Sequence, residues 1–156
     1  MRKTFKGKLL ILGLGNLLLQ DEGIGIHAIK YLEKFEWPDG VDLLDGGTGG
    51  FHMLSILDDY PVFIMIDAAL DNYSPGTIRV LEPKFSNEFP KALSSHDIGL
   101  KDLIESANLL GPLPKIYLIA VSIQPGQKLN MELSFELSHV LPDIATEVKK
   151  ILATEF

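Results

Sequence analysis

The 156-residue chain contains no cysteine, and this absence restricts the chemistry open to it. Without cysteine there can be no disulfide, no thiolate-bound zinc, no iron–sulfur cluster and no thiol nucleophile. Any catalysis must therefore use oxygen or nitrogen groups. The lack of disulfides fits a cytoplasmic location, which is the location we expect.

Basic residues are also scarce. The chain has 14 Lys and Arg against 21 Asp and Glu, which gives a formal net charge of −7. A nucleic-acid groove needs clustered Lys and Arg to displace counterions, so we expect no nucleic-acid partner. Hydrophobic residues make up 46% of the chain, which is ordinary for a globular protein.

No hydrophobic run is long enough to cross a bilayer, which needs about 18 to 20 residues. The longest N-terminal run, Leu9–Leu19, follows several basic residues and superficially resembles a signal peptide. Gly13, Gly15 and Asn16 interrupt this run, however, and no small-residue cleavage site follows it. We therefore expect neither a signal peptide nor insertion into a membrane.

Apolar stretches that suit strands alternate along the chain with segments of helical periodicity. Continuous apolar runs such as Val62–Asp67 favour strands buried on both faces, whereas the alternating Thr77–Glu82 favours an antiparallel edge strand. The last helix should bend or restart at Pro142, because proline lacks the backbone donor. The expected strands are Lys8–Gly13, Val41–Asp45, Val62–Asp67, Thr77–Glu82 and Lys115–Val121; the expected helices are Glu22–Phe35, Phe51–Asp58, Ile98–Asn108 and Asn130–Leu152.

This order of elements predicts an α/β fold, a three-layer α/β/α sandwich around a mostly parallel five-stranded sheet with one antiparallel edge strand. No internal repeat or linker divides the chain, so we expect a single domain over residues 1–156. One stripe of the last helical segment should face the core. Its members are Met131, Leu133, Leu137, Val140, Leu141, Ile144 and Val148.

Polar side chains gather where the predicted strands end. Glu22 follows the first strand, Asp45 ends the second, Asp67 ends the third, and His96 opens the helix after the edge strand. In an open parallel sheet, ligands bind beyond the carboxyl ends of the strands, at a topological switch point. The sequence therefore predicts that these loops converge on one crevice.

Dinucleotide binding is the first interpretation of this crevice, and the residues do not support it. Gly13-Leu14-Gly15 follows a strand, but Leu18 stands where the third glycine of the fingerprint belongs. Asp21 and Glu22 would also repel a pyrophosphate. A phosphate-binding loop is excluded as well, because the chain has no Gly-Lys-Ser/Thr.

A metal site is the second interpretation. Glu22, Asp67 and His96 could bind a divalent transition ion and leave positions open for water or substrate. Such an ion could polarise a carbonyl or activate water. Structural roles are also open: Glu22 can favour a helix N-terminus, Asp67 can cap a helix or form a turn, and His96 can lie on the surface. Asp45 can hydrogen-bond the glycine loop Gly46–Gly50.

Four motifs in order resemble those of the hydrogenase maturation endopeptidases, which act on [NiFe]-hydrogenases. The resemblance extends from Leu10 to about Leu152. The motifs are Gly13-x-Gly15-Asn16-x-Leu18-x-x-Asp21-Glu22-Gly23-x-Gly25, Asp45-Gly46-Gly47-Thr48-x-Gly50, Asp67-Ala68 with Pro75-Gly76 downstream, and Ser95-His96-x-x-Gly99-Leu100.

The resemblance implies an enzyme that removes a C-terminal extension from the precursor of the hydrogenase large subunit after nickel insertion. It implies a twisted five-stranded mixed sheet between helices. Glu22, Asp67 and His96 match the family's nickel-binding positions, with the nickel supplied by the precursor; zinc or cadmium could also occupy the site. Glu22 and Asp67 are also candidate catalytic residues. Asp45 is a further catalytic candidate, which would orient substrate or water.

Two other functions remain compatible with the same residues. One is a nickel-binding chaperone that binds the precursor without cutting it. The other is a small-molecule amidohydrolase on a related α/β scaffold. In each case we expect a monomer or a weak oligomer.

Overall fold

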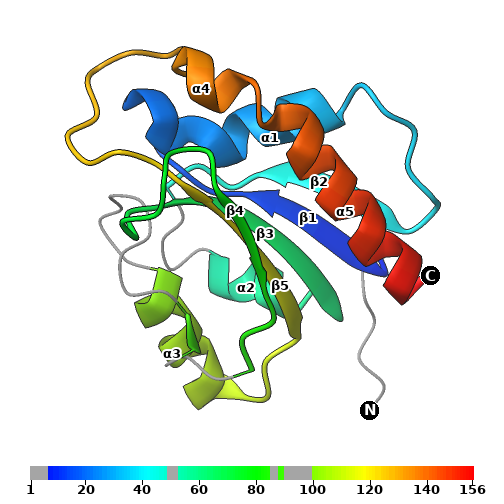
Figure 1. The fold of residues 1–156 in the computed structure, drawn as a ribbon. Coiled ribbons are helices and arrows are strands. Elements are labelled where there is room, and N and C mark those ends of the chain that lie inside the picture. The colour runs from blue at the N-terminus through cyan, green and yellow to red at the C-terminus, as the bar shows by residue number, and fades with distance from the viewer. Residues whose placement is uncertain (1–6, 49–52, 85–87, 90–99) are drawn as a thin grey trace.

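The computed structural model describes residues 7–48, 53–84, 88–89 and 100–156. Five strands form one sheet in the order β2-β1-β3-β5-β4, and β4 alone runs antiparallel to its neighbour (Figure 1). This confirms the predicted α/β fold with a mixed sheet and one antiparallel edge strand. The strands are β1 (Leu9–Gly13), β2 (Val41–Asp45), β3 (Val62–Ala69), β4 (Ile78–Leu81) and β5 (Lys115–Ser122).

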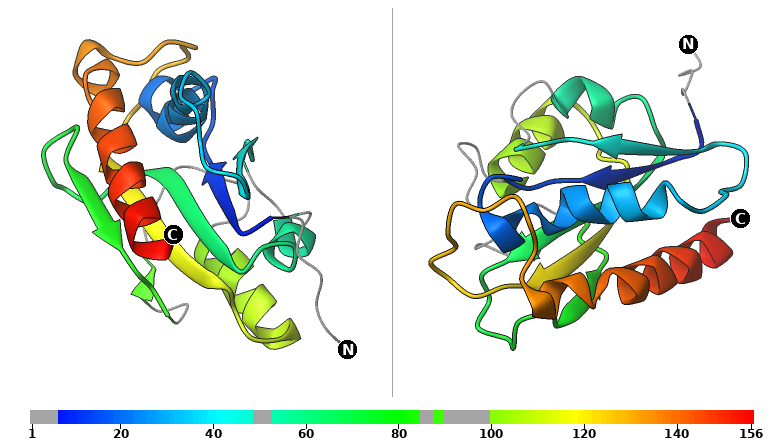
Figure 2. Two further views of the ribbon diagram at one scale, coloured as in Figure 1. Left: turned by 90° about the vertical axis from the view of Figure 1, so that its right-hand side faces the viewer. Right: turned by 90° about the horizontal axis from the view of Figure 1, so that it is seen from above.

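Helices cover both faces of this sheet. Helices α1, α4 and α5 lie on one face and α2 and α3 on the other (Figures 1 and 2). None of the helices in the described ranges is long and apolar enough to cross a membrane. The helices are α1 (Ile24–Leu32), α2 (Met53–Leu57), α3 (Leu100–Leu110), α4 (Phe135–Ser138) and α5 (Leu141–Glu155), and the 3-10 turn η1 (Gln20–Gly23) precedes α1.

The continuous apolar runs of the central strands follow from this layering, because successive side chains point to opposite faces. In β1, Leu9 and Ile11 pack into the core on the α1–α5 side. Leu10 and Leu12 pack into the core on the α2–α3 side. Both faces of the strand are therefore buried, as its sequence predicts.

The order of the strands creates a topological switch point between β1 and β3. From β1 the chain passes to β2 on one side, and it then returns to β3 on the other side of β1. The connections that leave these two strands consequently diverge, and an open crevice is expected between their carboxyl ends. Glu22 follows β1 and Asp67 lies in β3, so both predicted residues flank this point.

The predicted helix Glu22–Phe35 is wrong at its start. Residues 20–23 form the 3-10 turn η1, and α1 begins only at Ile24. The amide of Glu22 donates to the carbonyl of Leu19, three residues back, at 3.0 Å. Gln20 has a φ of 47°, which lies outside the α-helical region, so no α-helix can include it. The helix also ends at Leu32, before the predicted Phe35.

The predicted helix Asn130–Leu152 is wrong over its first five residues. Asn130 makes a parallel bridge to Leu19, so the segment before α4 is extended rather than helical. Met131, predicted in the core stripe, is 58% exposed for this reason. The predicted restart is correct, since α5 begins at Leu141 with Pro142 in its first turn, where no intrahelical donor is needed.

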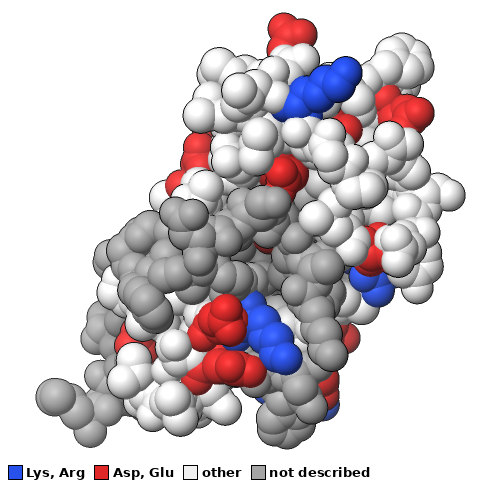
Figure 3. Space-filling view, turned by 90° about the vertical axis from the view of Figure 1, so that its left-hand side faces the viewer, with Lys and Arg blue, Asp and Glu red and all other residues white. Residues whose placement is uncertain are grey.

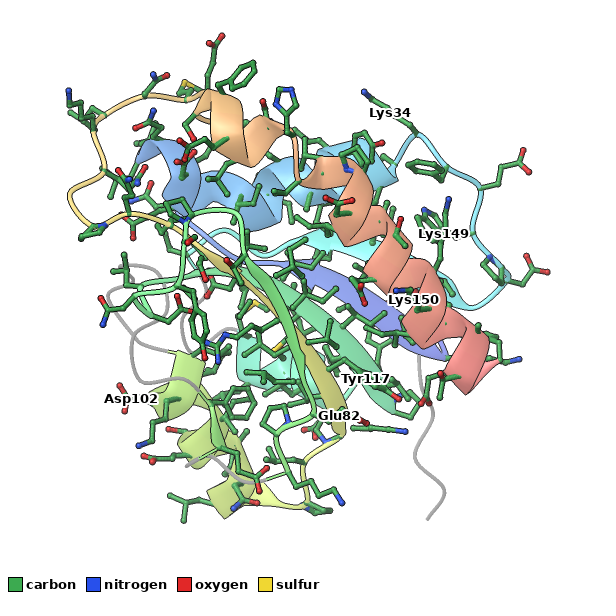
Figure 4. All side chains as sticks on the ribbon, viewed as in Figure 1. Lys34, Glu82, Asp102, Tyr117, Lys149 and Lys150 are labelled. Carbon is green, nitrogen blue, oxygen red and sulfur yellow. The ribbon has the colours of Figure 1, made fainter. Side chains whose placement is uncertain are left out.

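The far end of α5 is tied to the amino edge of the sheet. The Tyr117 hydroxyl on β5 donates to Oε2 of Glu155 at 2.5 Å, and Nζ of Lys115 lies 2.7 Å from the same oxygen. Tyr117 is labelled in Figure 4. The hydrogen bond from Lys115 contributes most to lowering the pKa of Glu155 below its usual value. These contacts hold α5 along the sheet, opposite the edge where the candidate site lies.

Helix α1 approaches the sheet so closely that no side chain fits between them. A Cβ on Gly25 would lie 2.2 Å from the carbonyl oxygen of Leu14 and 2.3 Å from that of Ile66. A Cβ on Gly13 would lie 2.2 Å from the carbonyl oxygen of Gly25. The atoms in the way are backbone, which cannot rotate aside, so glycine is required at both positions.

We therefore expect Gly25→Ala to lower the free energy of unfolding by about 3 kcal/mol, because the helix must shift away from the sheet. Urea denaturation followed by circular dichroism measures this change. Gly111→Ala is the matched control, since a Cβ there meets nothing within 4 Å. Equal denaturation midpoints for the two variants would contradict the proposed backbone contact.

Candidate active site

Glu22 lies in η1, immediately after the loop that leaves β1. Glu22 is only 5% exposed. The carbonyl of Glu22 accepts a hydrogen bond from the amide of Asn16 at 3.1 Å, which closes the loop on itself. Turn η1 also packs against β3, so Glu22 is held at the switch point rather than projecting into solvent.

Asp67 lies near the carboxyl end of β3 and is fully buried. Its Oδ1 accepts a hydrogen bond from the amide of Ala68 at 2.8 Å. The preceding residue, Ile66, accepts from the amide of Leu14 at 2.9 Å, which joins the ends of β1 and β3. The segments that carry Asp67 and Glu22 are therefore neighbours in space, as the strand ends predict.

Asp45 accepts a hydrogen bond from the glycine loop and so has a structural role. It is exposed, and its Oδ1 accepts from the amide of Gly47 at 2.9 Å. The carbonyl of Gly47 in turn accepts from the amide of Gly15 at 2.8 Å. Asp45 thus shapes the start of the glycine loop and ties it to the β1 loop, which is the structural alternative that the sequence left open.

His96 lies outside the described residues. Within the ranges that the structure describes, no three His, Asp or Glu side chains are grouped so that they could hold a metal ion. The structure thus brings together the elements that carry two of the three predicted ligands, Glu22 and Asp67. The complete ligand set stays a prediction.

Asp21 is an important residue that the sequence analysis did not identify. It is 5% exposed, and its two carboxylate oxygens accept from the amide and from the hydroxyl of Ser134, each at 2.8 Å. Its own amide donates to Oε1 of Gln127 at 2.9 Å. Because Asp21 adjoins Glu22, these bonds fix the position of Glu22. The partner is 113 residues away, so no local pattern could have shown the pair.

Further hydrogen bonds join the 127–134 segment to η1 and α1. The amide of Gln20 donates to the carbonyl of Asn130 at 2.7 Å, and the amide of Asn130 donates to the carbonyl of Leu18 at 2.9 Å. Nε2 of His27 donates to the carbonyl of Met131 at 3.1 Å. Burial lowers the pKa of His27, which favours the neutral ring, and its Nε2–H serves as a structural donor.

An open cleft of about 450 Å³ lies beside η1 at the carboxyl edge of the sheet. Among the residues that line it are three glutamines, Gln20, Gln124 and Gln127. Figure 3 shows the molecule from this side. Lys and Arg side chains do not cluster on the described part of this face, and Asp and Glu side chains lie between them. Amide side chains offer both donors and acceptors, which is what an extended peptide backbone needs.

We expect Asp21→Ala to lower the free energy of unfolding by about 2 kcal/mol, because it leaves the amide of Ser134 without its partner. Ser134→Ala should cost less, about 1 kcal/mol, since the backbone bond to Asp21 survives. Both changes can be measured by urea denaturation, with the exposed Glu36→Ala as the control. An Asp21→Ala variant as stable as the control would show that this contact does not hold η1.

Comparison with known proteins agrees with this architecture. The family model described as hydrogenase maturation protease matches residues 26–151. The hydrogenase expression/formation protein HupM of Azotobacter chroococcum mcd 1 is 36% identical over 124 residues, which cover 76% of this chain and 58% of that protein. The hydrogenase 2 maturation protease of Escherichia coli strain K12 is 34% identical over 125 residues, 76% of each chain.

The same relationship is visible in three dimensions. The hydrogenase maturating endopeptidase HybD from E. coli superimposes with a TM-score of 0.83 at 30% identity, over 94% of this chain and 93% of that one. The chain spans about three fifths of the length of the first curated relatives that it matches, 58% and 62%. Sequence and structure thus agree, and the chain belongs to the hydrogenase maturation protease family.

Proposed function

We propose that this chain is an endopeptidase that removes the C-terminal extension of a [NiFe]-hydrogenase large-subunit precursor after nickel has been inserted. The observation that carries the proposal is the placement of Glu22 and Asp67 on either side of the β1/β3 switch point, in a member of this family. Ligands of open α/β sheets bind at such a point.

In this proposal Glu22, Asp67 and His96 contact nickel that the precursor already holds. Carboxylate and imidazole groups are suitable ligands for divalent transition ions. The chain has no cysteine, so it offers no thiolate that would compete strongly for the metal. The chain therefore contacts the nickel without removing it from the precursor. Zinc or cadmium can bind to the same three side chains when the precursor is absent.

Recognition through the metal explains why processing would wait for nickel insertion. A nickel-free precursor lacks the binding energy that the three ligands supply, so the site discriminates between the two forms of one protein. Hydrolysis then adds a water oxygen to the scissile carbonyl carbon, breaks the C–N bond and protonates the leaving amine. Asp45, at the neighbouring strand end, remains the second candidate for orienting substrate or water.

The surface beside η1 supports contact with a protein partner. Leu18, Leu129 and Phe135 are 55%, 82% and 79% exposed, and all three flank the cleft or the segment tied to η1. Exposed apolar side chains next to a cleft suit a partner that buries them. In this proposal they contact the folded body of the precursor while the extension lies along the cleft.

The proposal is tested by incubating the chain with nickel-loaded and with nickel-free precursor and recording intact masses. We expect a loss of mass equal to the extension, in the nickel-loaded sample only. Binding with the precursor left intact would instead indicate a chaperone. Cleavage of small amides but not of the precursor would indicate an amidohydrolase, and equal cleavage of both precursors would exclude recognition through nickel.

The same cleavage assay, run on single variants, tests the role of each site residue. Glu22→Gln and Asp67→Asn each remove a carboxylate charge with little change in shape, and we expect each to slow cleavage by about a hundredfold. His96→Ala should have an effect of similar size. Glu36→Gln removes an exposed carboxylate in the loop after α1 and should cleave at the wild-type rate. Wild-type rates for all three site variants would remove them from the active site.

A further inference from the structure

Tyr73, in the loop between β3 and β4, holds an aromatic ring at the surface beside a second cleft. The residue is 52% exposed. The cleft measures about 340 Å³, and Tyr73 lines it together with Leu70, Ile123 and the two prolines Pro75 and Pro125. A single exposed apolar side chain needs no explanation, but one that forms the wall of an open, mainly apolar cleft is typical of a binding site.

Its neighbours in the loop and on β4 hold this ring in place. Nη2 of Arg79 lies 2.8 Å from Oδ2 of Asp71, and Cζ of Arg79 lies 4.7 Å from the centroid of the Tyr73 ring. Oδ1 of Asp71 accepts a hydrogen bond from the amide of Tyr73 at 3.3 Å. Arg79 is not among the described residues that line the cleft, so its guanidinium supports the ring from outside. A ring that is already held loses little conformational entropy when a partner binds to it.

The second cleft lies at the carboxyl ends of β3 and β5. Leu70 directly follows β3 and Ile123 directly follows β5, and the amide of Ile123 donates to the carbonyl of Ala69 at 3.0 Å. Leu70 comes three residues after Asp67, which is about 10 Å along an extended chain. An extended peptide covers the same distance in about three residues. A substrate that reaches Asp67 can therefore also reach this cleft.

The second cleft continues the cleft beside η1, because Pro75, Gln124 and Pro125 line both. Their linings differ in charge. Lys128 and Glu136 line the cleft beside η1, whereas none of the described residues that line the second cleft is charged. A charged side chain would lose hydration there without gaining a partner, while an apolar one would bury its surface. The lining therefore favours an apolar side chain as the occupant.

We propose that Tyr73 is a specificity-determining residue, whose ring forms one wall of a subsite for an apolar side chain of the precursor's C-terminal extension. This inference rests on the proposed endopeptidase function, in which the extension lies along the neighbouring cleft. The ring contacts that side chain as soon as the extension binds, and the contact changes little during hydrolysis. Tyr73 therefore contributes to binding of the precursor and not to the chemical step.

The test is Tyr73→Ala, measured by steady-state cleavage of the nickel-loaded precursor. We expect KM to rise about tenfold with kcat unchanged, which is the signature of a contact made equally in the ground state and the transition state. Tyr73→Phe keeps the ring and should cleave like the wild type. Phe156→Ala is the matched control, since that ring is 48% exposed, lies 5.6 Å from Nζ of Lys8 at the opposite edge of the sheet, and should not affect KM.

A double-mutant cycle identifies the partner of the ring. The apolar residues of the extension are changed to alanine one at a time, and each precursor is cleaved by the wild type and by Tyr73→Ala. We expect one position at which alanine raises KM for the wild type but not further for Tyr73→Ala, because the shared contact is already lost.

Two results would overturn the inference while leaving the proposed function intact. One is an unchanged KM for Tyr73→Ala. The other is a raised KM that couples to no position of the extension, which would place the ring against the folded body of the precursor instead. If the wild-type chain cleaves no precursor at all, the proposed function fails, and the inference fails with it.

Discussion

The backbone contact between α1 and the ends of β1 and β3 is the constraint on which the candidate site depends. Gly13 and Gly25 meet without side chains, so the helix starts directly above the switch point. The turn η1 is then forced onto β3, and Glu22 lies beside the strand that carries Asp67. A larger residue at either glycine would lift the helix and separate the two carboxylates. Gly13 and Gly25 therefore set the geometry of the segment between them, which carries Glu22, the residue that the proposed function assigns to the metal.

A second constraint acts from the other end of the chain. Asp21 accepts two hydrogen bonds from Ser134, which adjoins α4, and the 127–134 segment bonds to η1 along its length. Gln20 and Asn72 adopt left-handed backbone conformations, with φ of 47° and 67°, and both lie in loops at the carboxyl edge. Such conformations cost free energy and persist only where the surroundings fix them. The segment that carries Glu22 is thus held in place by its surroundings, as the proposed recognition of a metal-bearing precursor would require.

The central strands were largely predictable from the sequence because two-sided burial leaves an unbroken apolar run, and Val62–Asp67 differs by only two residues at its end. The edge strand Val41–Asp45, whose residues are half-buried or exposed, also has the predicted bounds. The errors lie where distant segments meet. Residues 130–134 carry helical periodicity, but the backbone bonds of Asn130 to Leu18 and Gln20 prevail over it. The role of Asp21 likewise depends on Ser134, a partner that no local pattern contains. Strand ends alone placed Glu22 and Asp67 at one edge, whereas their assignment to nickel came from the family resemblance.

In the proposed function Glu22 and Asp67 contact nickel within the precursor. X-ray absorption at the nickel edge tests it most directly, on the nickel-loaded precursor alone and on its complex with this chain frozen before cleavage. We expect the nickel to gain oxygen or nitrogen ligands in the complex, and to gain fewer when the complex is formed with Glu22→Ala. An identical nickel environment in the free and the bound precursor would contradict it.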